Sequence, residues 1–238
     1  VHLFGQPCEM DKIMNIAKKY KLYVVEDNAQ AHLAKYNSKI TGNFGKINGT
    51  SFYPTKNLGA IGEAGCVTTD DKDLNDFVRS YRNYGSSKKY VNDIIGSNSR
   101  LDEIQAAILN VKLNFIKEWN NDRKSIALKY NSFLSTCDDV KIPKKLNKCD
   151  HVYHLYVIQT QKRDELQRYL SQNGIGTSIH YPIPPHLQKA YSGLKFKKGD
   201  FPIAEILAKT SLSLPIYPGL SDPEIQYICD TITKFFKN

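Results

Sequence analysis

The chain has 238 residues, of which 41% are hydrophobic and 24% are charged, and its formal net charge is +9. These values are typical of a globular protein with a packed core, and no apolar run approaches the length of a membrane span. The basic charge favours polyanionic partners, but the lysines are scattered or in short pairs, so we expect no nucleic-acid partner and no membrane partner.

Residues 9–20 have helical apolar spacing, and residues 22–25 form a short apolar strand that ends at Glu26 and Asp27. Residues 50–53 and 66–69 are predicted as two further strands, followed by a helix that Asp70 and Asp71 cap. Helices alternating with strands predict an α/β layer structure, in which ligands gather at the carboxyl ends of the strands. Asp27 is therefore a candidate ligand contact.

Residues 84–100 are polar and rich in Gly, Ser and Asn, which predicts a long loop. A helix is expected from residue 104 to 119, with a bend and a continuation to 134. After Pro143 we expect a strand over 152–159, a helix over 163–173, a strand over 176–180 and a last helix over 225–235. The break at Pro143 predicts two domains, a large one over 1–142 and a small α+β domain over 143–238.

Five cysteines without a Cys-x-x-Cys pair indicate neither a disulfide framework nor a zinc site, and they favour a reducing cytoplasm. His151 and His154 fall in the strand predicted over 152–159 and its start, where their side chains would point to opposite faces, so no metal site is expected. The chain begins without Met and without a signal peptide, and we expect it to be the later part of a longer protein.

Lys56 lies between an apolar run and a Gly-rich turn, in Ser51-Phe52-Tyr53-Pro54-Thr55-Lys56-Asn57-Leu58-Gly59. A lysine in such a turn, together with Asp27 at a strand end, suggests a cofactor that needs both an amine and an anion for a charged ring. Pyridoxal phosphate has these needs. The alternative is that Lys56 is a solvated surface charge and that Asp27 is a turn residue.

The chain resembles the DegT/DnrJ/EryC1/StrS family of pyridoxal-phosphate-dependent sugar aminotransferases in seven stretches that follow the family's order. These are residues 1–7 (VHLFGQP), 25–32 (VEDNAQAH), 51–59 (SFYPTKNLG), 82–85 (RNYG), 98–107 (NSRLDEIQAA), 179–182 (IHYP) and 212–215 (LSLP). The resemblance implies a fold-type-I α/β transferase with a mainly parallel sheet in the large domain. It also implies a homodimer with shared active sites and a longer N-terminal part that holds a phosphate-binding turn.

The resemblance also implies roles for individual residues. Lys56 would be the Schiff-base lysine and proton carrier, and Asp27 the partner of the pyridine nitrogen. Gln30 would contact the ring hydroxyl, Ser51 the phosphate, and Asn98 the phosphate of the partner subunit's cofactor.

His180, Tyr181 and Arg82 resemble substrate-side residues of the family. The expected reaction transfers an amino group from L-glutamate to a keto sugar that is attached to dTDP or UDP. The sequence most resembles family members that act on a 3-keto sugar, so we expect a 3-keto-deoxyhexose. Its product would serve amino-sugar and polysaccharide synthesis, such as that of lipopolysaccharide O-antigen. The alternative is a truncated, inactive chain that acts only in folding or dimerisation.

Overall fold

A computed structural model describes residues 1–237, which form two compact units. The first unit comprises Val1–Asn121 and Lys145–His154, and the second comprises Asp122–Lys144 and the chain from Leu155 onward. The domain boundary predicted at residues 142 and 143 is not the boundary of these units, and it stays a prediction. Among the helices of residues 1–237, none combines the length and the apolar character needed to cross a lipid bilayer.

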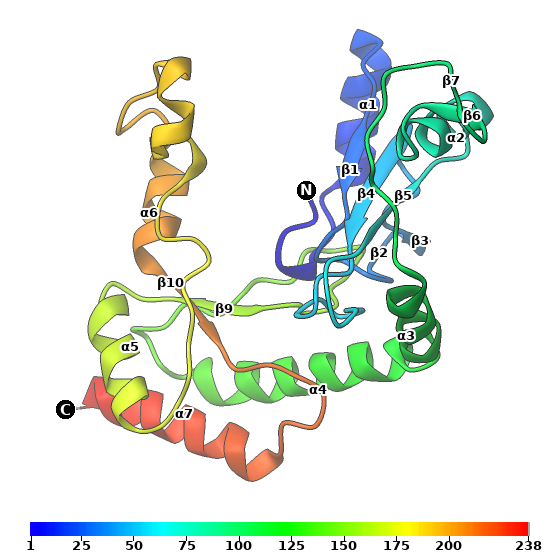
Figure 1. Cartoon of the computed structure of the whole chain (residues 1–238). Coiled ribbons are helices and arrows are strands. Elements are labelled where there is room, and N and C mark those ends of the chain that lie inside the picture. Colours follow the sequence, from blue (N-terminus) through cyan, green and yellow to red (C-terminus); the bar gives the residue numbers. More distant parts are fainter. Residues whose placement is uncertain (238) are drawn as a thin grey trace. The chain divides into compact units, whose positions relative to one another are not determined.

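The first unit is built on a three-stranded sheet in the order β1-β4-β5 (Figure 1). Strands β1 (Val25–Asp27) and β4 (Ile47–Ser51) are parallel, and β5 (Gly65–Thr68) is antiparallel to β4. Because β1 and β4 run in the same direction, their carboxyl ends meet at one edge of the sheet. The sheet therefore brings Asp27 and the turn after Ser51 to the same edge.

Around this sheet the first unit has short helices and small strand pairs. They are η1 (Leu3–Gly5), α1 (Met10–Tyr20), α2 (Lys72–Tyr81), α3 (Glu103–Leu113), β2 (Lys35–Tyr36), β3 (Lys39–Ile40), β6 (Ser86–Lys88), β7 (Val91–Asn92) and β8 (Cys149–Asp150). The helix α4 (Ile116–Leu134) begins in this unit and ends in the second. A helical stretch up to Leu134 is confirmed, but the break lies at Asn114 and Phe115, inside the helix predicted over 104–119 and not after it.

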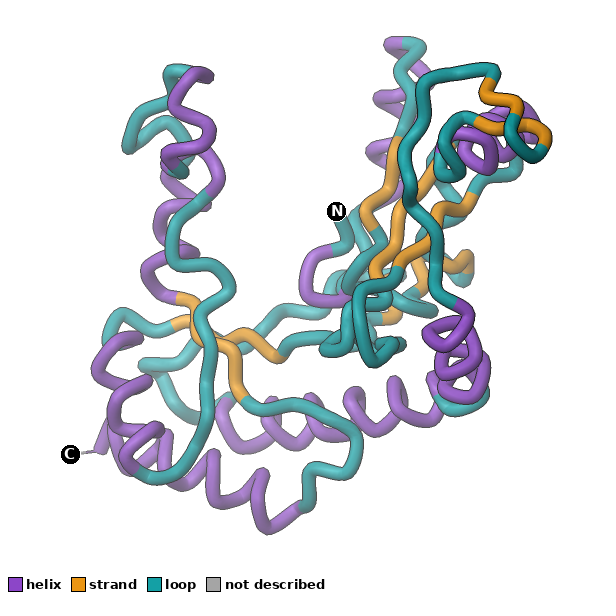
Figure 2. Tube along the Cα trace, viewed as in Figure 1, coloured by secondary structure: helices purple, strands orange, loops and turns teal. Residues whose placement is uncertain are grey.

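Two sequence predictions in this unit are only partly right. The strand predicted over 22–25 begins later, because Lys21 ends α1 in the left-handed conformation and Leu22 donates its N–H to Ala17. The segment predicted as loop over 84–100 contains the hairpin β6–β7, whereas the chain from there to α3 has neither helix nor strand (Figure 2).

The second unit contains the antiparallel pair β9 (Tyr156–Gln159) and β10 (Ser211–Leu214). Its other elements are α5 (Arg163–Gln172), η2 (Pro185–Leu187), η3 (Lys189–Leu194), α6 (Pro202–Thr210) and α7 (Asp222–Lys237). Helix α5 packs against α7 and β10. Buried apolar side chains from each of these three elements, such as Leu166, Leu212 and Ile232, form the interior.

The helices predicted over 163–173 and 225–235 are confirmed as α5 and α7, but the strands of this region differ from the prediction. The strand predicted from 152 starts at Tyr156, since Tyr153 has a positive φ of 43° and donates its N–H to the ring of His151. The strand predicted over 176–180 is reduced to one bridge between Ser178 and Ser213, and the sequence did not reveal α6 or β10.

Candidate active site

Lys56 lies in a tight turn that follows β4. Its backbone N–H donates to the carbonyl of Tyr53 at 2.9 Å, which closes the turn. Three residues later the chain doubles back so closely that a Cβ atom at Gly59 would lie 2.4 Å from the carbonyl oxygen of Pro54. Only glycine fits at that distance, so the sequence Pro54 to Gly59 can direct the lysine side chain from a compact backbone.

Side chains of several distant segments hold this turn. The Asn57 amide donates to Oδ1 of Asn120 at 2.8 Å, and its own Oδ1 lies 3.0 Å from Nδ1 of His154. On the other side of the turn, Lys112 donates to the carbonyl of Gly59 at 2.7 Å, and Gln105 accepts the N–H of Ile61 at 3.0 Å. The backbone beside Lys56 is therefore fixed from α3, from α4 and from the segment after β8.

Lys56 itself is half-buried and lies within the electrostatic field of Asp27. Burial lowers the pKa of its amine below the ordinary lysine value, and the negative charge of Asp27 opposes part of that shift. Because its side chain is half-buried, Lys56 is not the fully solvated surface charge of the alternative interpretation. The structure brings together the two residues for which the sequence predicted the central roles, while the roles themselves stay predictions.

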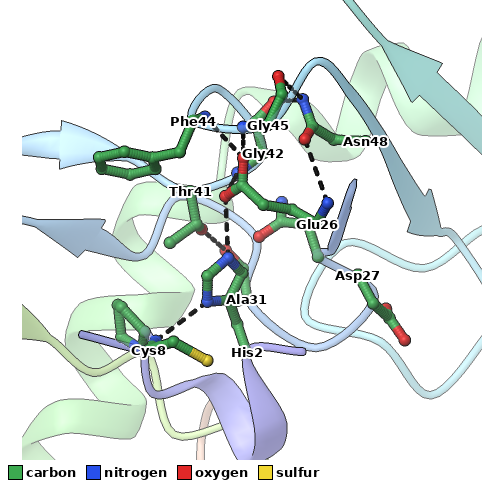
Figure 3. Close-up of polar contacts among 12 residues, drawn as sticks. His2, Cys8, Glu26, Asp27, Ala31, Thr41, Gly42, Phe44, Gly45 and Asn48 are labelled. Carbon is green, nitrogen blue, oxygen red and sulfur yellow. Dashed lines mark hydrogen bonds and ion pairs between the residues drawn. The ribbon is translucent and has the colours of Figure 1, made fainter. Parts of the chain in front are cut away.

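The two carboxylates of β1 have different surroundings (Figure 3). Adjacent strand residues point to opposite faces, so Glu26 is buried and Asp27 is exposed. Glu26 accepts the backbone N–H groups of Gly42, Phe44 and Gly45 at 2.6–2.7 Å, and it lies 2.9 Å from Nε2 of His2. Asp27 instead caps the N–H of Ala29 at 3.0 Å, which leaves its second oxygen directed away from the Glu26 cluster.

The Glu26 cluster consists of Glu26, His2 and the backbone N–H groups of Gly42, Phe44 and Gly45, and it was not predicted from the sequence. Burial alone would raise the pKa of Glu26, but its bonds to His2 and to the three N–H groups outweigh burial and lower it. Burial alone would lower the pKa of His2, and its contacts with Cys8 and Glu26 outweigh burial and raise it. Glu26 thus stays charged and ties β1 to the loop of residues 41–45, which fixes the backbone from which Asp27 projects.

His32 is a second residue that the sequence motifs do not single out. Its ring stacks on Phe52 with centroids 5.7 Å apart, and its Nε2 lies 3.4 Å from the hydroxyl of Thr50. Burial, together with the positive charge of Lys56, lowers the pKa of His32 to about 4, although a hydrogen bond to the backbone of Ser51 opposes part of that shift. A neutral imidazole at neutral pH therefore lies beside the lysine turn.

Gln30 and Ser51 belong to the same edge of the sheet. The Gln30 side chain is buried, and its Oε1 accepts the N–H of Phe4 at 2.6 Å, so it is not an exposed helix amide. The Ser51 hydroxyl accepts the N–H of Tyr53 at 3.2 Å. Both side chains are thus oriented by backbone groups at the edge of the sheet where Asp27 and the turn of Lys56 lie.

Arg82 and Asn98 form a separate group at the base of the loop after α2. Asn98 pairs with Asn83 in an isolated bridge, and Ser99 donates its N–H to the carbonyl of Arg82 at 2.8 Å. Both of the predicted residues are exposed. No hydrogen bond or ion pair within residues 1–237 joins either of them to Lys56, so the first unit contains two sets of predicted residues.

His180 and Tyr181 belong to the second unit. Nδ1 of His180 lies 2.8 Å from the hydroxyl of Ser213 on β10. The rings of His180 and Tyr181 meet edge to face, with centroids 5.5 Å apart. Tyr181 is 53% exposed. The sequence analysis placed His151 and His154 on a strand, and that assignment is wrong, because both residues precede β9. The ring of His154 instead contacts the side chain of Asn57.

Comparison with known proteins places the chain in a family. The sequence profile of the DegT/DnrJ/EryC1/StrS aminotransferase family matches residues 1–233. The chain is 46% identical over 235 residues to a dTDP-3-amino-3,6-dideoxy-alpha-D-galactopyranose transaminase of Aneurinibacillus thermoaerophilus, covering 99% of this chain and 64% of that protein. It is 41% identical to a dTDP-3-amino-3,4,6-trideoxy-alpha-D-glucose transaminase of Streptomyces venezuelae, covering 99% of this chain and 62% of that protein.

The fold is shared with solved structures of the family. The crystal structure of DesV from S. venezuelae in complex with a ketimine intermediate superposes with a TM-score of 0.97 at 41% identity, over 100% of this chain and 64% of that one. The predicted α/β fold class is therefore confirmed. The chain spans less than two thirds of the length of these relatives. With a profile match over nearly its whole length, the chain belongs to the DegT/DnrJ/EryC1/StrS aminotransferase family.

Proposed function

We propose that this chain carries the lysine-containing part of a pyridoxal-phosphate-dependent nucleotide-sugar aminotransferase. The observation that carries this proposal is the half-buried amine of Lys56, in the field of Asp27 and on a turn held from three sides. The cofactor needs a lysine that is neutral part of the time and an anion for its ring nitrogen, and this pair meets both needs.

The donor set at this edge of the sheet fits the cofactor. Asp27 has one carboxylate oxygen beyond the one that caps Ala29, and it lies at the carboxyl end of a parallel strand. Ser51 provides a hydroxyl donor for a phosphate oxygen, and the Gln30 amide nitrogen suits a ring hydroxyl. Pyridoxal phosphate, when bound, supplies an electron sink for the carbon that gains or loses the amino group.

Each residue has a physical task in this scheme. Lys56 holds the cofactor and afterwards carries a proton to and from the reacting carbon, which its lowered pKa makes easier near neutral pH. Asp27 keeps a proton on the ring nitrogen through its negative charge. His32, neutral in its buried site, adds no competing positive charge next to the amine. Glu26 keeps the strand under Asp27 in place.

The names of the relatives support a proposal for the substrate, and the family resemblance supports one for the assembly. The transaminases with which the chain aligns are named for dTDP-3-amino sugars, and a further relative from Acidithiobacillus ferrooxidans is a UDP-N-acetyl-3-dehydro-alpha-D-glucosamine 3-aminotransferase. We therefore propose a 3-keto sugar on dTDP or UDP as acceptor and L-glutamate as donor. In this proposal His180, Tyr181 and Arg82 face the substrate, and Asn98 completes the partner's site in a homodimer. The setting is amino-sugar synthesis in the cytoplasm, for example for O-antigen.

The test of the lysine assignment uses the absorbance of the bound cofactor. Pyridoxal phosphate added to the purified chain is expected to give the visible band of the lysine-bound cofactor, and the Lys56→Ala variant is expected to lack it. Lys56→Arg is the matched control, because it keeps the positive charge but cannot form the covalent bond. A band that persists in Lys56→Ala would refute the assignment of the lysine.

A second function, an inactive folding or dimerisation module, is favoured by one observation, namely that the chain covers only 62–64% of its relatives. The two functions differ in one assay. Release of 2-oxoglutarate from L-glutamate in the presence of a 3-keto sugar nucleotide would exclude the inactive module. A normal absorbance band without any 2-oxoglutarate would support it.

A further inference from the structure

Asn57 follows Lys56 directly, and its side chain uses its hydrogen-bonding groups inside the protein. Its amide nitrogen donates to Oδ1 of Asn120 at 2.8 Å and to the carbonyl of Val152 at 3.1 Å. Its oxygen faces Nδ1 of His154 at 3.0 Å, and the side chain is only 5% exposed. Two donors and one acceptor are satisfied, so the orientation of this amide is set by three separate residues.

Asn120 extends this connection to the other half of the site. It is 3% exposed, it accepts from Asn57, and its amide nitrogen donates to the carbonyl oxygen of His32 at 2.9 Å. His32 lies two residues after Gln30 and five after Asp27. The two amides therefore form a bridge from the residue beside Lys56 to the turn that carries Gln30 and follows Asp27.

The two asparagines lie where a small displacement of the Lys56 backbone would move the amine away from its reacting position. The lysine side chain is flexible, so its backbone origin decides where the amine can reach, and a misplacement of about 1 Å costs roughly 10²-fold in rate. An apolar pair of the same size would fill the space but could not fix the two backbones in register, because dispersion contacts lack direction. Directional amide bonds can do so.

We infer that Asn57 and Asn120 are positioning residues, which hold the backbone of Lys56 in fixed register with the backbone that carries Asp27. This inference rests on the proposed function, in which Lys56 and Asp27 hold the cofactor. The asparagine pair touches neither the cofactor nor the substrate in the proposal. It acts through the two turns, by setting the separation of the amine from the carboxylate.

The test cuts the bridge at Asn120, which is the residue farther from the lysine. Asn120→Leu keeps the branching of the side chain at Cγ and removes both bonds, and Asn120→Ala removes the bonds together with volume. Asn131→Ala is the matched control, since Asn131 lies on the same helix and accepts a 2.7 Å bond from the hydroxyl of Tyr156 within the second unit. Urea denaturation checks that each variant is folded, and Asn120→Leu carries the test if Asn120→Ala does not fold.

The first readout needs no cofactor. The reaction of Lys56 with acetic anhydride is followed against pH by mass spectrometry of its peptide, which gives the pKa of the amine. Loosening the turn hydrates the amine, so the midpoint is expected to rise toward the ordinary lysine value in both Asn120 variants. Asn131→Ala is expected to keep the wild-type midpoint. Unchanged midpoints in folded Asn120 variants would overturn the inference.

The second readout separates this inference from the proposed function. With pyridoxal phosphate added, the Asn120 variants are expected to keep the band of the lysine-bound cofactor, with its pH midpoint shifted and the cofactor affinity reduced about tenfold, as for roughly 1.4 kcal/mol. If Lys56→Ala keeps the band, the proposed function fails. If Lys56→Ala loses the band while the Asn120 variants titrate like wild type, only the positioning role fails.

Discussion

The buried imidazole of His32 makes the stability of this chain sensitive to acid. The ring is 6% exposed, stacks on Phe52 and lies in the field of Lys56. Burial, aided by the lysine charge, lowers its pKa from 6.5 to about 4. In the unfolded chain the same ring takes up a proton near its ordinary pKa. As the pH falls from about 6.5 toward 4, the unfolded state binds the proton first, and folding loses free energy.

The magnitude follows from the two pKa values of His32. A difference of one between the folded and unfolded pKa is worth about 1.4 kcal/mol, so lowering the pKa from 6.5 to about 4 is worth about 3 kcal/mol when it is fully expressed. Between pH 7 and pH 5 the unfolded ring becomes largely protonated, whereas the folded ring does not. Over that interval we expect protonation of His32 in the unfolded chain to lower the free energy of unfolding by about 2 kcal/mol.

The assay compares urea denaturation of the wild-type chain and of His32→Gln at pH 7 and at pH 5. Glutamine removes the titrating group, so the wild type is expected to lose about 2 kcal/mol more than the variant between the two pH values. Phe52→Leu is the control. It keeps the titrating group but reduces the burial of the His32 ring, so its pH dependence is expected to lie between those of the wild type and His32→Gln. An equal loss in wild type and His32→Gln would refute the reasoning.

Two further substitutions test the supports of the site. Glu26→Gln removes the negative charge that accepts hydrogen bonds from three backbone N–H groups and pairs with His2. This variant should lower the free energy of unfolding by about 3 kcal/mol. Asp27→Asn, at the exposed neighbouring residue, is the control and should change the free energy of unfolding by less than about 0.5 kcal/mol. Similar losses in these two urea titrations would contradict the role of the cluster. Gly59→Ala places a methyl group 2.4 Å from the Pro54 carbonyl and should cost about 1–3 kcal/mol, together with much of the cofactor absorbance band. Gly49→Ala, which meets nothing within 4 Å, is its control, and a Gly59 variant as stable as that control would show that the turn is not tight.

The local features of the site could be predicted from the sequence. Asp27 and Lys56 each follow a predicted strand, and the rule that ligands gather at the carboxyl ends of parallel strands brings them to one edge. The alternation of side chains along β1 also separates Glu26 from Asp27, although three residues were too few to tell which of the two would be buried.

The supports of Lys56 could not be predicted, because they come from far along the chain. Asn57 binds Asn120 and His154, which are 63 and 97 residues away, and the sequence near Asn57 carries no trace of either contact. His154 falls in a predicted strand because Val152 to Gln159 is mostly apolar and aromatic. The left-handed turn at Tyr153 overrides that preference, and the imidazole bonds to the lysine turn instead of lying on a sheet.

The contacts that fix Lys56 have a consequence for how function is divided in this chain. The side chains that hold its turn, namely Gln105, Lys112, Asn120 and His154, all belong to the first unit, as does Asp27. Within residues 1–237, these contacts that position the turn of Lys56 therefore come from one unit. Arg82 and Asn98 stand apart from it in that unit, and His180 and Tyr181 belong to the other. A defect in substrate recognition should thus leave the pKa of the Lys56 amine intact, because none of those four residues is among its causes.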